Sequence, residues 1–456
     1  METEADQVGS RWRDLYRKED WWAVWVGVGL TAIAVVLFET GATSALTTLA
    51  TSASKLQWTH LSQVGHHFVD KAGVYAVAFV FWALILGVTS RIMGVRLSRF
   101  LPAFAVVFVL SAVIFAVSGW KNARTFNLEA PLVALLVGLL LANTVRLPQW
   151  MDDGFRVEYF IKVGIVLLGA GFPITLVLTA GPVALLQATI ISLATCLLIY
   201  WVGTRVFKLD RRLCAVLGVG GAVCGVSAAM AIASSVRAKR EHVLTTVSLV
   251  VGWALVMIVA LPLVSRWIGL SAGVAGAWIG TSEFADAAGL AAATSYGHTA
   301  GNEQQAVQAF TLMKVIGRDM WIGIWAIAFA LISTMSWEHD RAAVRRRVHL
   351  AEIWWRFPKF VFGFFLASIA VTLITNGYPD AEFTSKVKPG LVDPLNAVRT
   401  WAFVFCFLSI GLTTRLRELR GVTRKEFATF TSGVGLNVVL GFVLSVMVFG
   451  SYWAAL

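Results

Sequence analysis

Long runs of apolar residues recur along the whole chain and are separated by short polar stretches. Each run holds about 18 or more mostly apolar positions, enough for a helix to cross ~30 Å of hydrocarbon. This pattern predicts an all-α polytopic membrane protein with about thirteen transmembrane segments. The expected segments are residues 21–38, 74–94, 101–120, 128–145, 160–178, 182–206, 213–236, 244–268, 272–296, 307–337, 353–375, 397–416 and 427–449.

Composition agrees with this pattern. Apolar residues make up 58% of the chain and charged residues 14%, whereas soluble domains average roughly 25% charged residues. One soluble core cannot bury so much apolar surface, so the lipid bilayer is the expected partner. The first segment is expected to be retained as a helix, because the stretch before it is longer and more acidic than the start of a signal peptide.

Lysine and arginine predict the orientation, because basic loops stay on the cytoplasmic side. With a cytoplasmic N-terminus, thirteen crossings place 25 basic residues inside and 10 outside. If the seventh and ninth segments instead fold back as re-entrant hairpins, the numbers become 27 and 8. Charge leaves both alternatives open, and Arg237, Lys239 and Arg240 are the residues that change side. The net charge of +12 then reflects topology, and no nucleic-acid partner is expected.

Residues typical of metal sites and enzymes are not arranged for that chemistry. All four cysteines fall in expected transmembrane segments, which argues against a disulfide framework. The adjacent His66 and His67 have no cysteine or acidic pair at ligand spacing. An enzyme would also need an activated nucleophile or a metal. We therefore expect no metal, no cofactor and no enzyme activity.

Two segments contain residues that interrupt helices. In the seventh segment, Gly218, Gly220, Gly221 and Gly225 fall within eight residues and are followed by Ser227. Each glycine costs roughly 1 kcal/mol relative to alanine in a helix, so a continuous helix is disfavoured. A hydroxyl group can then cap a new helix. This predicts a first broken helix near residues 213–236.

The ninth segment has a similar interruption at Gly280, Thr281 and Ser282. Broken helices expose free N–H groups inside the membrane, where secondary transporters bind anions and coupling ions. Close helix packing through small residues is the alternative for either segment. Two interruptions in one chain favour a transport site, with a second broken helix near residues 272–296.

Four charged residues follow in the ninth and tenth segments. Glu283 and Asp286 are three apart and share a helix face. Acids inside a membrane are expensive, so we expect these two to bind the coupling ion, unless the end of the segment simply lies in water. Lys314 and Arg318 are four apart and also share a face. They are expected either to bind an anion or to pair with the two acids. The residues expected to bind substrate are Gly221, Cys224, Gly225, Ser227, Gly280, Thr281, Ser282, Lys314 and Arg318.

Residues 171–181 and 411–421 both follow an apolar run and match in glycine spacing. They lie at the ends of the fifth and twelfth segments, which run in opposite directions because their numbers differ by an odd count. This match predicts two inverted repeats.

Four stretches carry a resemblance to a known family. They are GLLLAN before Thr144, VGIVLLGAGFPIT from Val163, GGAVCGVSAAMA from Gly220 and AWIGTS from Ala277. With them, the chain resembles the YeiH-like family of sulfate exporters from about residue 101 to its end. The resemblance implies the fold of the bile acid, arsenite and riboflavin transporter superfamily, in which broken helices cross in a mobile core beside a scaffold. It also implies alternating access, a homodimer and the bacterial inner membrane.

The chain departs from the family pattern in three places. Phe284 and Ala285 stand where the family usually has a His-Glu pair, and the family's Lys-x-x-Arg is one residue longer here, from Lys314 to Arg318. Residues 1–100 would form a cytoplasmic N-terminus and two additional helices, and residues 101–456 the transporter core of two inverted repeats.

These observations predict a secondary transporter or exporter of a small anion, of the sulfate or organosulfonate class, coupled to H⁺ or Na⁺. The alternative is a cation/proton antiporter of similar architecture that uses Glu283 and Asp286. A receptor or assembly subunit would leave the intramembrane charges unexplained.

Overall fold

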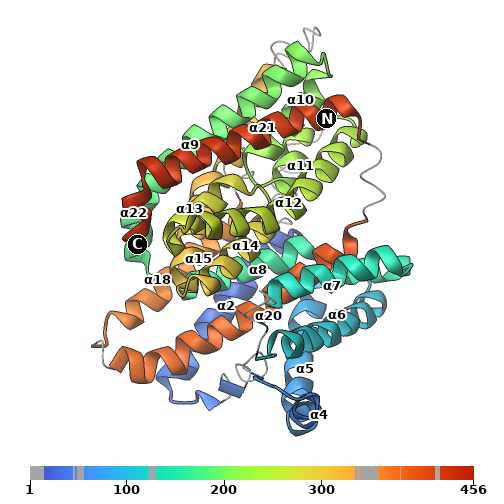
Figure 1. Ribbon diagram of the computed structural model, residues 1–456. Coiled ribbons are helices and arrows are strands. Elements are labelled where there is room, and N and C mark those ends of the chain that lie inside the picture. Colours follow the sequence, from blue (N-terminus) through green and yellow to red (C-terminus); the bar gives the residue numbers. More distant parts are fainter. Residues whose placement is uncertain are drawn as a thin grey trace, which may run out of the picture. The chain divides into compact units, whose positions relative to one another are not determined.

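The computed structural model describes residues 15–44, 47–48, 56–121, 123, 130–333, 337, 358–379, 382–415 and 422–456 (Figure 1). Regular structure in this part is helical, apart from an isolated bridge between Trp58 and Trp120. The chain forms two compact units. Unit 1 comprises Met1–Leu176 and Lys359–Arg415, and unit 2 comprises Val177–Pro358 and Leu416–Leu456.

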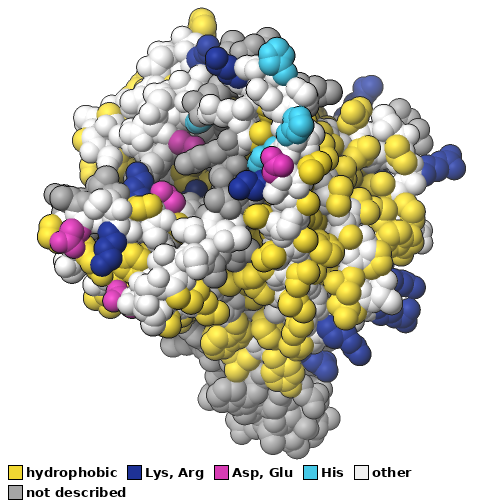
Figure 2. All heavy atoms as spheres, turned by 90° about the horizontal axis from the view of Figure 1, so that it is seen from below, with side chains coloured by type: hydrophobic (Ala, Val, Ile, Leu, Met, Phe, Trp, Pro, Cys, Tyr) yellow, Lys and Arg dark blue, Asp and Glu magenta, His cyan; other side chains and the backbone are white. Residues whose placement is uncertain are grey.

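Eight helices among the described residues are long and apolar enough to cross a membrane, which confirms a polytopic membrane protein. They are Glu19–Glu39, Ala72–Ile92, Leu97–Ser118, Ile174–Val206, Arg240–Ile268, Glu303–Ile332, Ser385–Thr413 and Arg424–Val448. Large apolar side chains on them are exposed, as expected where lipid replaces water. Figure 2 shows apolar side chains over much of one face and basic side chains in small groups near its edges.

Unit 1 is a helical bundle. Its elements are α2 (Glu19–Glu39), α4 (Leu61–Asp70), α5 (Ala72–Ile92), α6 (Leu97–Ser118), α7 (Ala130–Thr144), η1 (Gln149–Gly154), α8 (Val157–Ala170), α18 (Lys359–Thr375), η6 (Phe383–Val392) and α20 (Asp393–Thr413). Helix α7 packs along α20, and α8 packs along both α18 and α20. A Cβ atom on Gly411 would lie 2.7 Å from the Cα atom of Gly138, so these glycines let the backbones of α7 and α20 touch.

Helix α2, one of the two helices predicted to be additional, packs against α8 and α18 in unit 1. Its first residues form ion pairs with α8 and with the residue before it: Glu19 with Arg156, and Asp20 with Lys162 at 2.7 Å. The predicted division of the chain at residue 100 stays a prediction.

Unit 2 contains the remaining helices. They are α9 (Ile174–Trp201), which begins just before the unit boundary, η2 (Val202–Val206), α10 (Arg211–Ala222), α11 (Val226–Ser235), α12 (Arg240–Ile268), α13 (Ala272–Ser282), α14 (Asp286–Thr299), α15 (Glu303–Thr311), η3 (Leu312–Arg318), α16 (Trp321–Ile332), α21 (Arg424–Phe442), η8 (Val443–Val448) and α22 (Gly450–Ala454).

The predicted boundary between the fifth and sixth segments is wrong. Pro182 lies inside α9, and the chain turns earlier, at residues 171–173. Gly171 and Pro173 end α8 there, because proline cannot continue the preceding helix. A proline near the start of a long helix is tolerated more easily than the sequence pattern suggested.

The seventh segment is a helical hairpin, here called hairpin 1, formed by α10 and α11. The side chain of Arg212, at the start of α10, donates to the carbonyl of Arg237, just beyond α11, at 3.1 Å. A straight helix would separate these two residues by ~37 Å at 1.5 Å per residue. The chain therefore turns back at residues 223–225.

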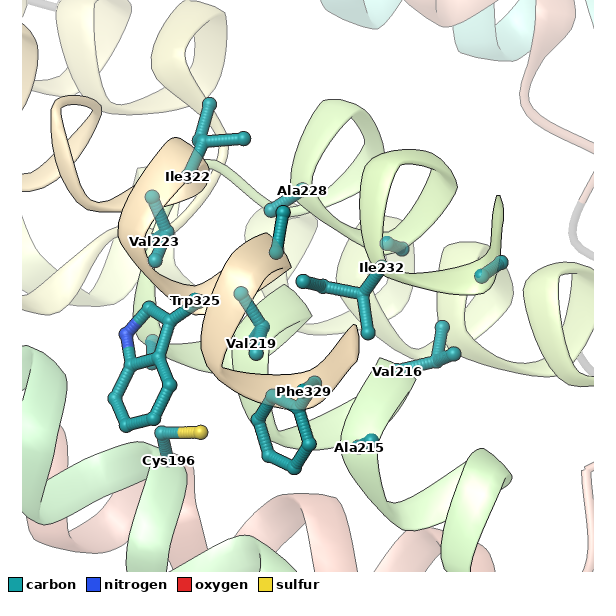
Figure 3. Close-up of a cluster of buried hydrophobic side chains, with 14 of the residues drawn as sticks. Cys196, Ala215, Val216, Val219, Val223, Ala228, Ile232, Ile322, Trp325 and Phe329 are labelled. Carbon is teal, nitrogen blue, oxygen red and sulfur yellow. The ribbon is translucent and has the colours of Figure 1, made fainter. Parts of the chain in front are cut away.

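An apolar cluster holds the two arms of hairpin 1 together (Figure 3). Val219 of α10 and Ile232 of α11 belong to it, and both arms pack there against Ile322, Trp325 and Phe329 of α16. Small residues keep the arms close: a Cβ atom on Gly220 would lie 3.7 Å from the Cβ atom of Ala229. The glycine-rich sequence that predicted a break thus also permits the close packing of the arms.

The ninth segment is a second helical hairpin, here called hairpin 2, formed by α13 and α14. The hydroxyl of Tyr296, near the end of α14, donates to the carbonyls of Leu270, just before α13, and of Ser265, in the last turn of α12. Both segments therefore fold back as hairpins, which is the path of the re-entrant alternative that the charge distribution left open. With a cytoplasmic N-terminus, as the sequence predicts, this path would place 27 basic residues inside and 8 outside.

The two hairpins point toward each other. Helix α12 runs for 29 residues, ~43 Å at 1.5 Å per residue. Its first residue, Arg240, adjoins the open end of hairpin 1, and its last, Ile268, adjoins the open end of hairpin 2. The hairpins therefore enter from opposite ends of α12.

We predict that cysteines at Arg211 and Arg240, at the open end of hairpin 1, are labelled by a membrane-impermeant maleimide from the same side of the membrane. A cysteine at Ser271, at the open end of hairpin 2, should be labelled from the other side. All three positions are exposed, and the four native cysteines are buried. Labelling of Arg211→Cys and Arg240→Cys from opposite sides would contradict the hairpin.

Candidate functional site

The tips of the two hairpins meet. A Cβ atom on Gly225, in the turn of hairpin 1, would lie 3.2 Å from the carbonyl oxygen of Phe284, in the turn of hairpin 2. Gly225 has φ of 69°, a conformation that favours glycine. The ammonium of Lys314 links the tips, because it donates to the carbonyls of Val223 at 2.6 Å and Phe284 at 2.9 Å.

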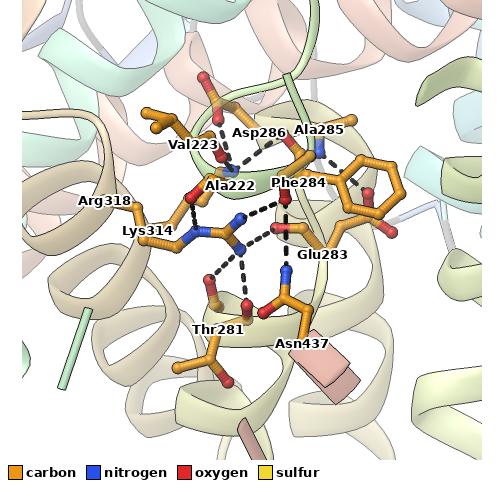
Figure 4. A network of polar contacts seen from close by, with 12 residues as sticks. Ala222, Val223, Thr281, Glu283, Phe284, Ala285, Asp286, Lys314, Arg318 and Asn437 are labelled. Carbon is orange, nitrogen blue, oxygen red and sulfur yellow. Dashed lines mark hydrogen bonds and ion pairs between the residues drawn. The ribbon is translucent and has the colours of Figure 1, made fainter. Parts of the chain in front are cut away.

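Arg318 makes a second link between the tips (Figure 4). Its Nε and Nη2 atoms donate to the carbonyls of Ala222 and Gly221, each at 3.2 Å, at the end of α10. Its Nη1 atom donates to the carbonyls of Thr281 at 2.6 Å and Glu283 at 3.1 Å, at the end of α13. The last carbonyls of a helix lack partners within the helix and carry partial negative charge. Arg318 thus satisfies the carbonyl ends of both hairpins.

Lys314 and Arg318 lie in the π-helix η3, inside the long helix from Glu303 to Ile332. The wider turn is seen in the bond from the backbone N–H of Asp319 to the carbonyl of Lys314, at 3.0 Å and five residues back. Such π-helical turns occur often at functional sites. Both cationic side chains are fully buried, so their donors are directed at the hairpin tips instead of at solvent.

The two acids occupy different positions. Asp286 is the first residue of α14, and its Oδ1 atom lies 3.3 Å from the ammonium of Lys314. Glu283 follows α13, and its Oε1 atom accepts from the backbone N–H of Ala285 at 2.9 Å. Its Oε2 atom has no hydrogen-bond partner among the described residues. The sequence spacing placed both acids on one helix face, but the turn of hairpin 2 separates them.

The tips are accessible only at the start of their second arms. In residues 221–229 every residue is buried except Val226 and Ser227, and in residues 279–290 every residue is buried except Ala285 and Asp286. These four residues lie at the N-terminal ends of α11 and α14. The carbonyl ends of α10 and α13 are therefore enclosed, while the N–H ends of α11 and α14 reach the surface of the unit.

The structure brings the predicted site residues together in unit 2. Gly221, Gly280, Thr281 and Ser282 lie in the last turns of α10 and α13, Cys224 and Gly225 lie in the turn of hairpin 1, Ser227 lies in the first turn of α11, and Lys314 and Arg318 lie in η3. Their roles in binding substrate, and those of Glu283 and Asp286 in coupling, stay predictions. Within the described part of the chain, no three His, Cys, Asp or Glu side chains form a group able to hold a metal ion.

Two buried residues of this site were missed from the sequence. Asn437 of α21 is fully buried, and its Nδ2 atom donates to the carbonyl of Gly221 at 3.4 Å, the same carbonyl that Arg318 contacts. Asp319 is also fully buried, next to Arg318 in the chain. An asparagine inside the last apolar segment was a usable signal, because polar side chains are costly in a membrane-spanning helix.

A family model described as Conserved hypothetical protein 698 matches residues 102–429. The chain belongs to this family. A relative named UPF0324 membrane protein, from Rhodopirellula baltica, is 32% identical over 385 residues, covering 83% of this chain and 68% of the relative. The UPF0324 membrane protein of Nitrosomonas europaea is 26% identical and covers 89% of this chain and 90% of its own length.

A further UPF0324 membrane protein, from Nitratidesulfovibrio vulgaris, is 28% identical over 80% of this chain, which spans 62% of that relative's length. No solved structure matches the chain. The UPF0324 family is thus a membrane-protein family, and the names of these relatives state no substrate. The geometry of the hairpin tips is therefore the main indication of function.

Proposed function

We propose that this UPF0324 protein is a secondary transporter of a small anion that binds at the meeting tips of hairpins 1 and 2. The observation that carries the proposal is that two hairpins from opposite ends of α12 meet, with Lys314 and Arg318 on their carbonyl ends. Non-helical backbone at membrane depth is tolerated only where protein or a water-filled cavity surrounds it. In secondary transporters such interruptions form the substrate and ion sites.

The anion would bind at the N-terminal end of α11, because the corresponding end of α14 already carries the carboxylate of Asp286. The backbone N–H groups of a first helical turn and the positive end of the helix dipole attract negative charge there. Ser227 adds a hydroxyl in the first turn of α11. The carbonyl ends, which would repel an anion, are already neutralised by Lys314 and Arg318. The hydrogen bonds of these two cations go to the backbone. Lys314 and Arg318 would therefore favour anion binding indirectly, by holding the tips together and by adding positive charge near the site.

The proposed movement follows from where the site lies. All residues of the site belong to unit 2, so a movement of unit 2 as a body would carry the site with it and give alternating access. Four parts of this proposal rest on the family resemblance: a substrate of the sulfate or organosulfonate class, export from the cell, a homodimer and the bacterial inner membrane. The cytoplasmic N-terminus rests on the distribution of basic residues.

A cation/proton antiporter is the second candidate, because two acids lie near the tips. One geometric fact disfavours it. Asp286 is 3.3 Å from Lys314, so the acid that is accessible already has a cationic partner. An antiporter of this kind would have to break that ion pair in every cycle.

A panel of small anions tests the proposal on purified protein in lipid nanodiscs. Sulfate, a sulfonate, a carboxylate and chloride are added separately, and the midpoint of thermal unfolding is followed. A ligand at 100 times its Kd stabilises the folded state by about 2.7 kcal/mol, so the bound anion should raise the midpoint in a saturable way. If only monovalent cations shift the midpoint, the antiporter is favoured instead.

A further inference from the structure

Glu283 and Asp286 differ in whether their charge is balanced. The carboxylate of Asp286 lies 3.3 Å from the ammonium of Lys314, which also donates to two tip carbonyls. The two carbonyls accept hydrogen bonds from the ammonium, and the Asp286 carboxylate adds an ion pair at 3.3 Å. Asp286 therefore has a counter-charge in the ammonium of Lys314, and loss of the carboxylate charge would leave that buried cation without it.

Glu283 has no such partner. Its side chain is fully buried, and no ion pair joins it to another described residue within 4 Å. Its Cγ atom and the ring of Phe310 both lie close to Gly289: a Cβ atom on Gly289 would be 2.9 Å from that Cγ atom and 2.5 Å from the ring. One carboxylate oxygen accepts from the N–H of Ala285, and the other has no hydrogen-bond partner among the described residues. A charge in this position would be poorly compensated.

The charges around the tips balance only in one protonation state of Glu283. Among the residues that the structure describes, four other charged groups lie around the tips, all of them at or next to η3 and α14: Lys314, Arg318, Asp286 and Asp319. The thiol of Cys224 faces the two cations from hairpin 1, and α15 contributes the ring of Phe310. Two cations and two anions cancel, so the site is neutral when Glu283 carries a proton and has one excess negative charge when it does not.

We propose that the free carboxylate oxygen of Glu283 binds and releases one proton, and that Asp286 keeps its charge throughout as the partner of Lys314. The inference rests on the proposed transport function and names its coupling ion and carrier. The proton adds to Oε2 to form an O–H bond and leaves from the same atom. A hard metal cation would need several oxygen ligands at once, whereas a proton needs a single oxygen.

Infrared difference spectra between acidic and alkaline pH test the inference on the full chain in lipid. Wild-type protein should show a protonated-carboxyl C=O band at neutral pH that disappears as pH rises. The band should be missing in Glu283→Gln and retained in Asp286→Asn. Glu283→Asp, which keeps a carboxyl group, should retain the band at a shifted position and guards against misfolding of the Gln variant.

The matched control is Glu303→Gln, a change at an acid in the first turn of α15 whose side chain is 44% exposed. Its spectrum at neutral pH should keep the wild-type band. Persistence of the full band in Glu283→Gln would overturn the inference, as would loss of the band in Asp286→Asn or in an Asp319→Asn variant with Glu283 intact. A band that responds to Na⁺ at constant pH would assign the site to Na⁺ and also overturn it.

This experiment needs no substrate, so it can succeed where the transport proposal fails. A second experiment tests proton binding and transport together. It uses proteoliposomes that contain a pH-sensitive dye, with a sulfate gradient across their membrane. Wild-type protein should move protons with sulfate, and Glu283→Gln should lower proton movement at least tenfold relative to sulfate movement. Equal proton coupling in both proteins would overturn the role of Glu283 while leaving sulfate transport standing.

Discussion

Arg318→Ala should lower the free energy of unfolding by about 3–5 kcal/mol, because it leaves buried groups without their only charged partner. Five carbonyls at the ends of α10 and α13 lose this donor, and of these the Gly221 carbonyl keeps the amide of Asn437 at 3.4 Å. Hydrogen bonds to a charged group contribute about 1.5–3 kcal/mol each in favourable cases, so the loss is large even after partial relaxation. Chemical unfolding of the purified protein in mixed micelles measures it.

Arg318→Lys should recover only part of this stability. An ammonium is a point donor and cannot reach both helix ends as the planar guanidinium does. The control is Arg266→Ala, a change at an exposed arginine in the last turn of α12, which should cost less than about 1 kcal/mol.

The partners of Arg318 also determine whether a second change at Glu283 can restore the stability lost in Arg318→Ala. If its main role were an ion pair with Glu283, the Glu283→Gln change would restore most of the stability lost in Arg318→Ala. The contacts to carbonyls predict little restoration, since neutralising Glu283 gives these carbonyls no donor in place of Arg318. A double variant as stable as Glu283→Gln alone would contradict the account of Arg318 as a clamp on the two helix ends.

Lys314→Met should lower the free energy of unfolding by about 2–3 kcal/mol, since it removes a buried donor to two carbonyls and leaves Asp286 without its counter-charge. In this case a second substitution, at Asp286, should restore part of the lost stability. Adding Asp286→Asn should restore about 1 kcal/mol or more, because residues in one salt bridge show coupling energies of 0.5–3 kcal/mol.

Lys239→Met, at an exposed lysine just before α12, is the matched control and should be nearly neutral. Additive effects of Lys314→Met and Asp286→Asn would show that the 3.3 Å contact adds no stability. The opposite behaviour of the two cations, with rescue at Lys314 and none at Arg318, is a specific consequence of the geometry at the tips.

The sequence predicted where the chain is interrupted but not the path it takes there. Glycines from Gly218 to Gly225 disfavour a continuous helix whether the chain then goes on or turns back. The contact between Arg212 and Arg237 decides between the two paths, and it joins residues 25 positions apart. Local helix preferences carry no information about a contact between residues so far apart in the chain.

The roles of the site residues show the same limit. Lys314 and Arg318 could be identified from the sequence, because charges in an apolar segment stand out. Their main partners are backbone carbonyls, which every residue carries and which no sequence pattern marks. The division of roles between Glu283 and Asp286 likewise depends on the turn at residues 283–285, which places one acid beside Lys314 and the other against Phe310.

The N-terminal end of α11 is the place where the central claim can be tested with one substitution. Ser227→Asp adds a negative charge in the first turn of α11, where the helix dipole stabilises it. Ser227 is partly exposed, so the carboxylate fits without displacing a buried group. It would repel an anion at the same N–H groups while leaving the fold intact.

The most direct measurement is counterflow of a labelled small anion, beginning with sulfate and the anion that shifts the unfolding midpoint most, into proteoliposomes loaded with the same unlabelled anion. The account predicts saturable uptake by the wild-type protein and by Arg266→Ala, and at least about a tenfold loss in Ser227→Asp, equivalent to 1.4 kcal/mol of binding free energy. No uptake of any panel anion above protein-free liposomes, or equal uptake by Ser227→Asp, would contradict an anion site at the hairpin tips.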